Sequence, residues 1–181
     1  MTGSNKQKGF SMVELLITGV VFSIIFGVAT ITFVNTIRVQ KYNMAHQQLM
    51  DQASYAIEYM DRAIRMAIKD DGFCGFAGQN YKVSDENRKI EFKNYKGECQ
   101  EFFWDTNDNQ LKVYKADFGA SLPLTSDDFE ITSFNFQVSG DNTGDRFQPR
   151  ITLSMDIRGK GSDQQPRIKI QTTISQRNLD L

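Results

Sequence analysis

The 181-residue sequence has a single histidine, His46, and only two cysteines. It contains no Gly-x-Ser-x-Gly and no glycine-rich phosphate loop, so it offers no residues for nucleophilic catalysis or nucleotide chemistry. Cys-x-x-Cys is also absent, which removes the usual pattern of thiol redox and zinc sites. We therefore expect a protein that is not an enzyme and that holds no metal and no cofactor.

Neither sign of charge predominates, because 21 Lys and Arg residues stand against 22 Asp and Glu residues, giving a formal net charge of −1. A surface dedicated to nucleic acid needs clustered Lys and Arg to contact phosphates. The sequence therefore predicts no nucleic-acid partner. Internal repeats and low-complexity segments are lacking too, which leaves an ordinary folded domain joined to one unusual segment.

That segment is an apolar run from Phe10 to Val34, which contains no Lys, Arg, Asp or His. At about 1.5 Å per residue, a helix of this length covers the roughly 30 Å hydrocarbon core of a bilayer. A secretory signal peptide has a shorter apolar region of about 7 to 15 residues and ends at a small-residue cleavage site, which is missing here. A plain membrane anchor remains as an alternative.

One charge interrupts the run, at Glu14. A carboxylate inside a membrane costs on the order of a few kcal/mol, so it needs a partner. If the peptide bond after Gly9 is cut, Phe10 gains a free α-amine with a reference pKa of about 8. This amine could pair with Glu14 within one helix or between neighbouring helices, and only the second arrangement drives assembly.

The sequence Lys8-Gly9-Phe10, with Glu14 as the fifth residue after Gly9, resembles the N-terminal signature of type IV pilins and pseudopilins over about residues 6–34. The resemblance implies cleavage after Gly9 by a prepilin peptidase and N-methylation of Phe10. It implies that Glu14 neutralises the amine of an adjacent subunit. The implied partners are the prepilin peptidase, other pilin or pseudopilin subunits, an inner-membrane assembly platform and membrane lipid.

The charges that flank the run do not orient it, since Lys6 and Lys8 precede it and Arg38 and Lys41 follow it. The resemblance implies a single-pass protein of the cell membrane with a cytoplasmic N-terminus and an extracytoplasmic head. Such a protein would be extractable into a pilus or pseudopilus.

The expected organisation is a cleaved leader at residues 1–9, a transmembrane and assembly half-helix at residues 10–34, and a head at residues 35–181. The helix is expected to continue to Asp70-Asp71-Gly72, because no Pro or Gly intervenes after Val34. Beyond the membrane its apolar residues step by four and three, as on one buried helical face: Leu49, Ala53, Ala56, Met60, Ala63 and Ala67. This face needs a sheet to cover it.

After Gly72 the apolar pattern changes from helical to alternating. Five or six strands are expected, with Asp117–Asp128 interpreted as a loop: Lys89–Tyr95, Gln100–Asp105, Leu111–Ala116, Phe129–Val138, Ile151–Arg158 and Ile168–Ile174. The predicted fold class is α+β and pilin-like. A long N-terminal α-helix, transmembrane in its inner half, packs through its outer half on a mostly antiparallel β-sheet.

Cys74 and Cys99 both fall outside the membrane in the implied orientation, and we expect them to form a disulfide. The alternative is two free thiols in a host without an oxidising compartment. Two acidic loops, 105–109 and 140–145, carry oxygen ligands that calcium could use. The first lacks the glycine and glutamate of an EF-hand, and turn chemistry explains both loops.

The head size, Pro123-Leu124-Thr125, the closing hairpin and the end Ser175–Asn178 are similar to J-type minor pseudopilins and the related W-type minor pilins. This implies a minor pilin or pseudopilin subunit of a type IV pilus or type II secretion-like fibre, which helps to initiate or cap assembly. One alternative is a membrane-anchored pilin-like binding module for DNA or surface contact in an uptake or adhesion system. It predicts an exposed basic or aromatic patch, for which Phe102, Phe103 and Trp104 are candidates. A membrane-anchored sensor or chaperone, uncleaved at Gly9, is a further alternative.

Overall fold

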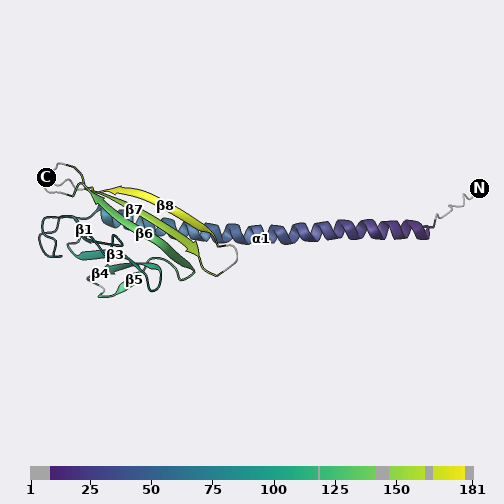
Figure 1. The fold of residues 1–181 in the computed structure, drawn as a ribbon, viewed down its shortest axis with the longest axis horizontal. Helices are drawn as coiled ribbons and strands as arrows, with labels where there is room; N and C mark the ends of the chain where they lie inside the picture. Colours follow the sequence, from purple (N-terminus) through teal and green to yellow (C-terminus); the bar gives the residue numbers. More distant parts are fainter. Residues whose placement is uncertain (1–8, 118, 142–146, 162–164, 178–181) are drawn as a thin grey trace, which may run out of the picture. The chain divides into compact units, whose positions relative to one another are not determined.

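The computed structural model describes residues 9–117, 119–141, 147–161 and 165–177. The chain divides into two compact units, Met1–Asn43 and Met44–Leu181. A single helix, α1 (Met12–Arg65), begins in the first unit and ends in the second. The eight strands of the described residues all belong to the second unit (Figure 1).

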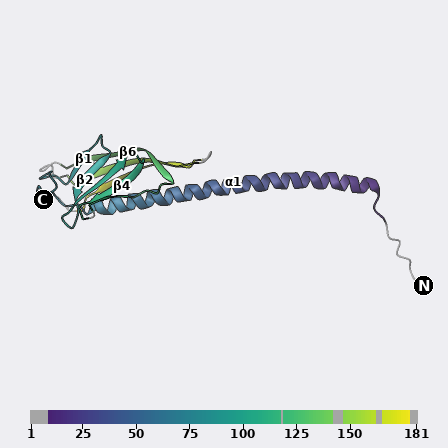
Figure 2. The same cartoon turned by 90° about the horizontal axis from the view of Figure 1, so that it is seen from below.

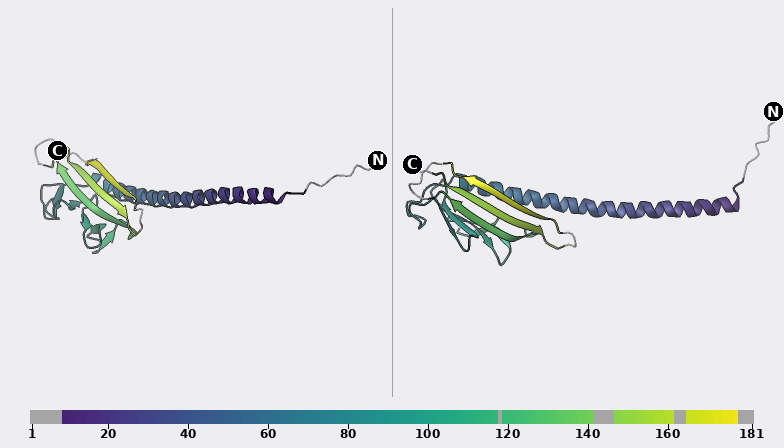
Figure 3. Two further views of the ribbon diagram at one scale, coloured as in Figure 1. Left: turned by 45° about the vertical axis from the view of Figure 1, so that its right-hand side comes forward. Right: turned by 45° about the horizontal axis from the view of Figure 1, so that its top comes forward.

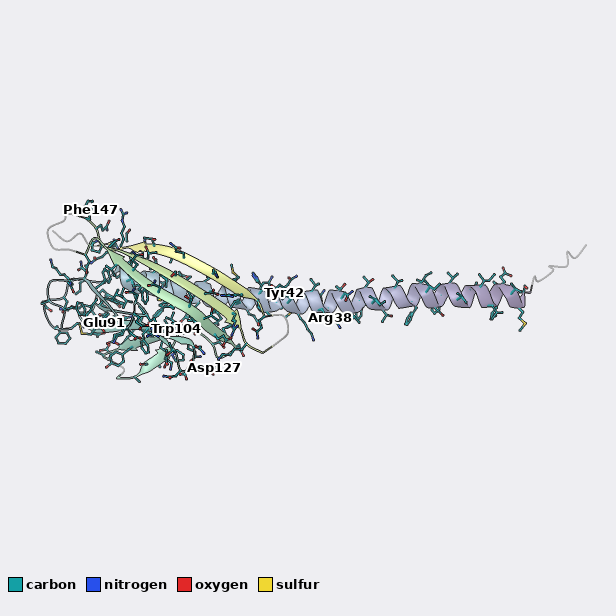
Figure 4. The ribbon with its side chains drawn as sticks, viewed as in Figure 1. Arg38, Tyr42, Glu91, Trp104, Asp127 and Phe147 are labelled. Atoms are coloured by element: carbon teal, nitrogen blue, oxygen red, sulfur yellow. A yellow bond between two sulfur atoms is a disulfide. The ribbon has the colours of Figure 1, made fainter. Side chains whose placement is uncertain are left out.

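In the first unit the helix exposes its apolar side chains on every side (Figure 4). Large apolar residues from Met12 to Val34 are between 42% and 83% exposed, so this segment is not the core of a folded domain. None of the residues in its most apolar stretch is buried. By length and composition α1 could therefore cross a membrane.

In the second unit one face of α1 is fully buried, as the sequence predicts. Five residues of this face have no exposed surface: Leu49, Ala53, Ala56, Met60 and Ile64. The small side chains of Ala53 and Ala56 allow close packing on the helix, while Met60 and Ile64 supply apolar bulk. Burial of a large apolar side chain contributes about 1.5 to 3 kcal/mol, so this face rather than helix propensity holds the segment in place.

The strands form two antiparallel sheets instead of the one expected from the sequence. The first sheet has the order β1-β2-β3-β4-β5: Tyr81–Ser84, Lys89–Lys93, Cys99–Asp105, Gln110–Lys115 and Ser121–Pro123. Figure 2 labels β1, β2 and β4 of this sheet. The second has the order β6-β7-β8, which Figure 3 shows as three long neighbouring strands: Phe129–Ser139, Arg150–Gly159 and Arg167–Ser175.

The two sheets join along β6. The backbone N–H of Ile131 donates to the carbonyl of Asn109 at 2.8 Å, and that of Phe136 donates to the carbonyl of Asn87 at 2.7 Å. Both acceptors lie in turns of the first sheet. These bonds hold β6 against the turns of the first sheet. The two sheets and the helix share one hydrophobic core, in which Phe102 and Phe136 have no exposed surface.

The α+β fold class is confirmed, and each of the six predicted strands appears within two residues of its expected bounds. Strands β1 and β5 were not predicted. β5 lies inside the expected loop, is exposed at all three positions and ends at Pro123. Proline has no N–H for a ladder and is tolerated in an edge strand such as β5. Because all three residues are exposed, the strand has no alternating apolar pattern that could have revealed it in the sequence.

The predicted helix end at Asp70-Asp71-Gly72 is wrong, because α1 ends at Arg65. Carbonyl groups at a helix end need donors. Here Arg177 N donates to the Arg65 carbonyl at 2.9 Å, and Gln176 Nε2 donates to the Ala67 carbonyl at 2.9 Å. Ile68 then pairs with Lys93 of β2 as an isolated bridge. Partners more than a hundred residues away therefore end the helix early.

One charge pair anchors the second sheet on its outer side. Asp156 on β7 has only 8% of its side chain exposed and accepts a hydrogen bond from Arg167 Nε at 2.7 Å. Lys169 Nζ lies 3.7 Å from the same carboxylate. The hydrogen bonds from Arg167 hold the pKa of Asp156 below its ordinary value, against the opposing effect of burial.

Asp156→Asn is expected to lower the free energy of unfolding by about 2 kcal/mol at pH 7, the usual worth of a hydrogen bond to a charged group. Because the folded pKa lies below the unfolded value of about 3.9, this stabilisation is present above that value and is lost as the pH falls through the folded pKa. Urea unfolding at pH 7 and in strong acid measures the difference, which should vanish in acid. Glu58→Gln, which breaks the exposed pair with Arg62, is the control and should change little. A deficit for Asp156→Asn that persists in acid would contradict the assignment.

Candidate functional site at the start of the helix

The peptide bond between Gly9 and Phe10 lies in exposed, non-helical backbone. The helix begins at Met12, and the Leu15 N–H donates to the carbonyl of Ser11 at 3.2 Å. Exposed backbone outside regular structure is where proteases cut most readily. The remaining leader residues 1–8, with Lys6 and Lys8, lie outside the described residues.

Gly9 has no packing role among the described residues. A Cβ atom added there would have no heavy atom within 4 Å, and no left-handed backbone angle is recorded for Gly9. Folding of the described chain therefore does not explain a glycine at this position.

Glu14 lies in the first turn of α1, where the positive end of the helix dipole favours an acidic group. Within the described part of the chain it has no hydrogen bond and no ion pair. Glu14 follows Ser11 by three residues, the spacing of a capping box, but the return bond to the Ser11 N–H is not formed. Sequence reasoning missed Ser11, which that spacing could have revealed.

The hydroxyl groups of the same segment differ from Glu14, because they bond to carbonyls of their own helix. Four of them donate hydrogen bonds to backbone carbonyls at 2.8–2.9 Å: Thr18 to Leu15, Ser23 to Gly19, Thr30 to Phe26 and Thr32 to Val28. These hydroxyls need no outside partner in an apolar environment. The Glu14 side chain forms no such bond within its own helix among the described residues.

The predicted cysteine pair is present as a disulfide between Cys74 and Cys99, with a Cα–Cα distance of 5.6 Å. It ties the loop after α1 to the first residue of β3. Asp70, which is 2% exposed, accepts hydrogen bonds from the N–H groups of Cys74 and Phe76 in the same loop. The disulfide therefore belongs to the fold and lies far along the sequence from Gly9, Phe10 and Glu14.

Acidic side chains of the two loops form hydrogen bonds with other residues of the protein. Lys112 Nζ bonds to Asp105 at 2.6 Å and also to Asp108, and this hydrogen bonding lowers the pKa of Asp105. Asp141 accepts a hydrogen bond from the backbone N–H of Asn80 at 3.1 Å. No cluster of three or more potential metal ligands occurs in the described residues, and residues 142–146 of the second loop lie outside them.

The three adjacent aromatic residues of β3 are buried or half-buried. Phe102 has no exposed surface, and Phe103 and Trp104, the latter labelled in Figure 4, are half-buried. His46 is likewise half-buried on α1. This stretch does not form the exposed aromatic patch that a DNA-binding or surface-binding module requires.

Comparison with known families shows that residues 4–30 fit the model of the prokaryotic N-terminal methylation motif. No curated protein and no solved structure matches the chain. The matched residues include Gly9, Phe10 and Glu14, the three site residues predicted at the N-terminus. The N-terminal segment of this chain is therefore a type IV pilin-like methylation signal at the start of an apolar helix.

Proposed function

We propose that this chain is a non-catalytic subunit of a pilus or pseudopilus, cleaved after Gly9 and N-methylated on Phe10. The observation that carries the proposal is Glu14, which lies on an exposed apolar helix inside the matched methylation motif and has no partner among the described residues. A carboxylate inside a membrane needs a cation, and cleavage would create one at Phe10. Methylation keeps that positive charge.

The pairing that we propose runs between subunits. An intrahelical pair would require Phe10 to occupy the helical turn before Glu14, whereas α1 begins only at Met12. A neighbouring helix in the membrane can present its own amine to Glu14 instead. This pairing would couple the apolar helices laterally and select neighbours in a defined register. The partners would be other pilin-like subunits, the prepilin peptidase and the inner-membrane assembly platform.

The position of the subunit is the finer part of the proposal. We assign a minor, J-type or W-type subunit that helps to initiate or cap a type IV pilus or type II secretion-like fibre. The closing hairpin β7–β8 and the Pro123-Leu124-Thr125 segment, which begins at the last residue of β5, support this assignment. The protein would reside in the cell membrane with its head outside until it enters the fibre.

Gly9→Ala is expected to abolish processing, so that the protein isolated from membranes retains Met1 and gains no methyl group. The reason is that a peptidase reading Gly9 at the cleavage position would lose its recognition residue, while the fold loses nothing. Mass spectrometry of the intact chain measures the outcome. Gly19→Ala is the matched control, since a Cβ at Gly19 also meets nothing within 4 Å, and this variant should be processed normally. Wild-type protein with an intact Met1 in assembled material would overturn the proposal and favour a plain membrane anchor, sensor or chaperone.

A further inference from the structure

Two cations follow the apolar run of α1 at its C-terminal end. Arg38 and Lys41 are the only Lys or Arg residues between residues 15 and 50, and this interval contains no Asp or Glu. Both cations belong to the first unit, and both are exposed. The nearest acidic residues along the chain are Glu14 and Asp51, so the two positive charges are not offset by their own segment.

Neither cation has a partner in the described part of the chain. Arg38 and Lys41 form no hydrogen bond and no ion pair with the described residues. Cations of the second unit are often paired, as in Lys112, whose Nζ lies 2.6 Å from Asp105. The charges of Arg38 and Lys41 are therefore available to an anion from outside the chain.

The position of the two cations along α1 matches the headgroup layer of a bilayer. At about 1.5 Å per residue, Met12–Val34 is long enough to cover the roughly 30 Å hydrocarbon core. Along the helix axis, Arg38 lies about 6 Å beyond Val34 and Lys41 about 10 Å beyond it. The headgroup layer adds about 5 to 7 Å on each side of the core. Arg38 therefore falls within this layer, and the long side chain of Lys41 reaches back to it.

The spacing of the cations suits a single phosphate group. Residues three apart are neighbours on a helix surface, with about 5 to 6 Å between their Cβ atoms. The Arg38 guanidinium can donate two parallel hydrogen bonds to phosphate oxygens, while the Lys41 ammonium adds a point charge. Tyr42 is 39% exposed and is the first Tyr or Trp of the sequence, and tyrosine is enriched at membrane interfaces. Arg38 and Tyr42 are labelled on α1 in Figure 4.

We propose that Arg38 and Lys41 bind the phosphate of an anionic phospholipid, in the leaflet on the side of the head. Their depth favours a lipid over a soluble anion, because the acyl chains of a lipid can lie along the exposed apolar surface of residues 12–34. The uncompensated positive charge favours an anionic headgroup over a zwitterionic one, in which a cation already neutralises the phosphate. This contact would hold the helix at one height in the bilayer until the subunit leaves the membrane.

Solid-state NMR in bilayers tests the contact with phosphate. The full chain, labelled with ¹³C at the guanidinium carbon of arginine, is reconstituted in liposomes of phosphatidylglycerol and phosphatidylcholine. Dephasing by ³¹P should attenuate part of the guanidinium signal, and this attenuation should be lost in Arg38→Gln. Arg150→Gln, which changes an exposed arginine of the second unit, is the control and should retain it. No dephasing in the wild type, or dephasing that survives in Arg38→Gln, overturns the proposal.

Lipid retention in native mass spectrometry tests the class of headgroup. From micelles with equal amounts of phosphatidylglycerol and phosphatidylcholine, the wild type should retain phosphatidylglycerol in about tenfold excess. Arg38→Gln/Lys41→Gln should abolish this preference, whereas Lys69→Gln/Lys96→Gln, which removes two exposed lysines of the second unit, should keep it. Equal retention of the two lipids by the wild type, or an equal loss in both double variants, overturns the proposal. Displacement of the lipid by an equal amount of free glycerol phosphate would also overturn it, in favour of a soluble anion.

The proposal rests on the proposed function only for the placement of α1 in a membrane, and it does not depend on Glu14 or on cleavage at Gly9. If the phosphate contact is found while Gly9→Ala is processed normally, the lipid site stands and the subunit function fails. If the contact is absent while processing follows expectation, the subunit function stands and the lipid site fails. Loss of crosslinks to neighbouring subunits in Arg38→Gln/Lys41→Gln, without a phosphate contact in the wild type, would assign the two cations to a carboxylate of another subunit instead.

Discussion

Glu14→Ala is expected to reduce crosslinking of this chain to neighbouring pilin-like subunits in membranes by more than a hundredfold. Removing one partner of a desolvated charge pair costs about 3 to 5 kcal/mol, and each 1.4 kcal/mol is a factor of ten. Insertion of the helix should be unchanged or easier, because a carboxylate is costly in a bilayer. The measurement is the yield of disulfide crosslinks between cysteines introduced into adjacent helices, in membranes where cleavage after Gly9 is normal.

Glu14→Gln separates the two roles that the structure allows for this residue. Glutamine retains the ability to bond back to the Ser11 N–H in a capping box, but it cannot neutralise an amine. If the charge is what matters, Glu14→Gln loses crosslinks as severely as Glu14→Ala. Thr18→Val is the control, since Thr18 bonds only to its own helix and should crosslink normally. Crosslinks at the wild-type level in Glu14→Ala would show that Glu14 is not the docking group, and they would favour a simple membrane anchor.

The N-terminal methylation motif was recognisable from the sequence because its determinants are local. Gly9, Phe10 and Glu14 lie within six residues, and one carboxylate in an apolar run is visible without a fold. The buried face of α1 was predictable for a related reason, since helical periodicity places Leu49, Ala53 and Ala56 on one side before any partner is known.

Features that depend on distant segments were not predictable. At the end of α1 the chain returns from far along the sequence, since Arg177 N donates to the Arg65 carbonyl and Gln176 Nε2 donates to the Ala67 carbonyl just beyond the helix. A cavity of about 420 Å³ is a second case, because Tyr59 of α1 and Lys115 of β4, which both line it, are distant in the sequence. Secondary-structure propensity and the alternation of apolar residues depend only on neighbours along the chain. They therefore do not predict contacts between segments that are distant in the sequence.

Reduction of the Cys74–Cys99 disulfide is expected to lower the melting temperature of the second unit by roughly 10 °C. The two cysteines are 25 residues apart in sequence, and closing a loop of about that size stabilises the folded state by roughly 3 kcal/mol in the chain-entropy model. In the reduced protein the loop after α1 would be held mainly by Asp70, whose carboxylate accepts from Cys74 and Phe76. Thermal unfolding of the full chain in micelles, followed by circular dichroism with and without reductant, measures the shift.

The double variant Cys74→Ser/Cys99→Ser gives the matched control for that measurement. It should melt at the temperature of the reduced wild type and should not respond to reductant, since neither protein has the crosslink that restricts the unfolded chain. A shift in wild type alone therefore isolates the disulfide from any effect of reductant on the micelle. Two titratable thiols in the native, unreduced protein would contradict the pairing outright, and the 5.6 Å separation of the two Cα atoms would then reflect packing of the loop against β3 without a covalent bond.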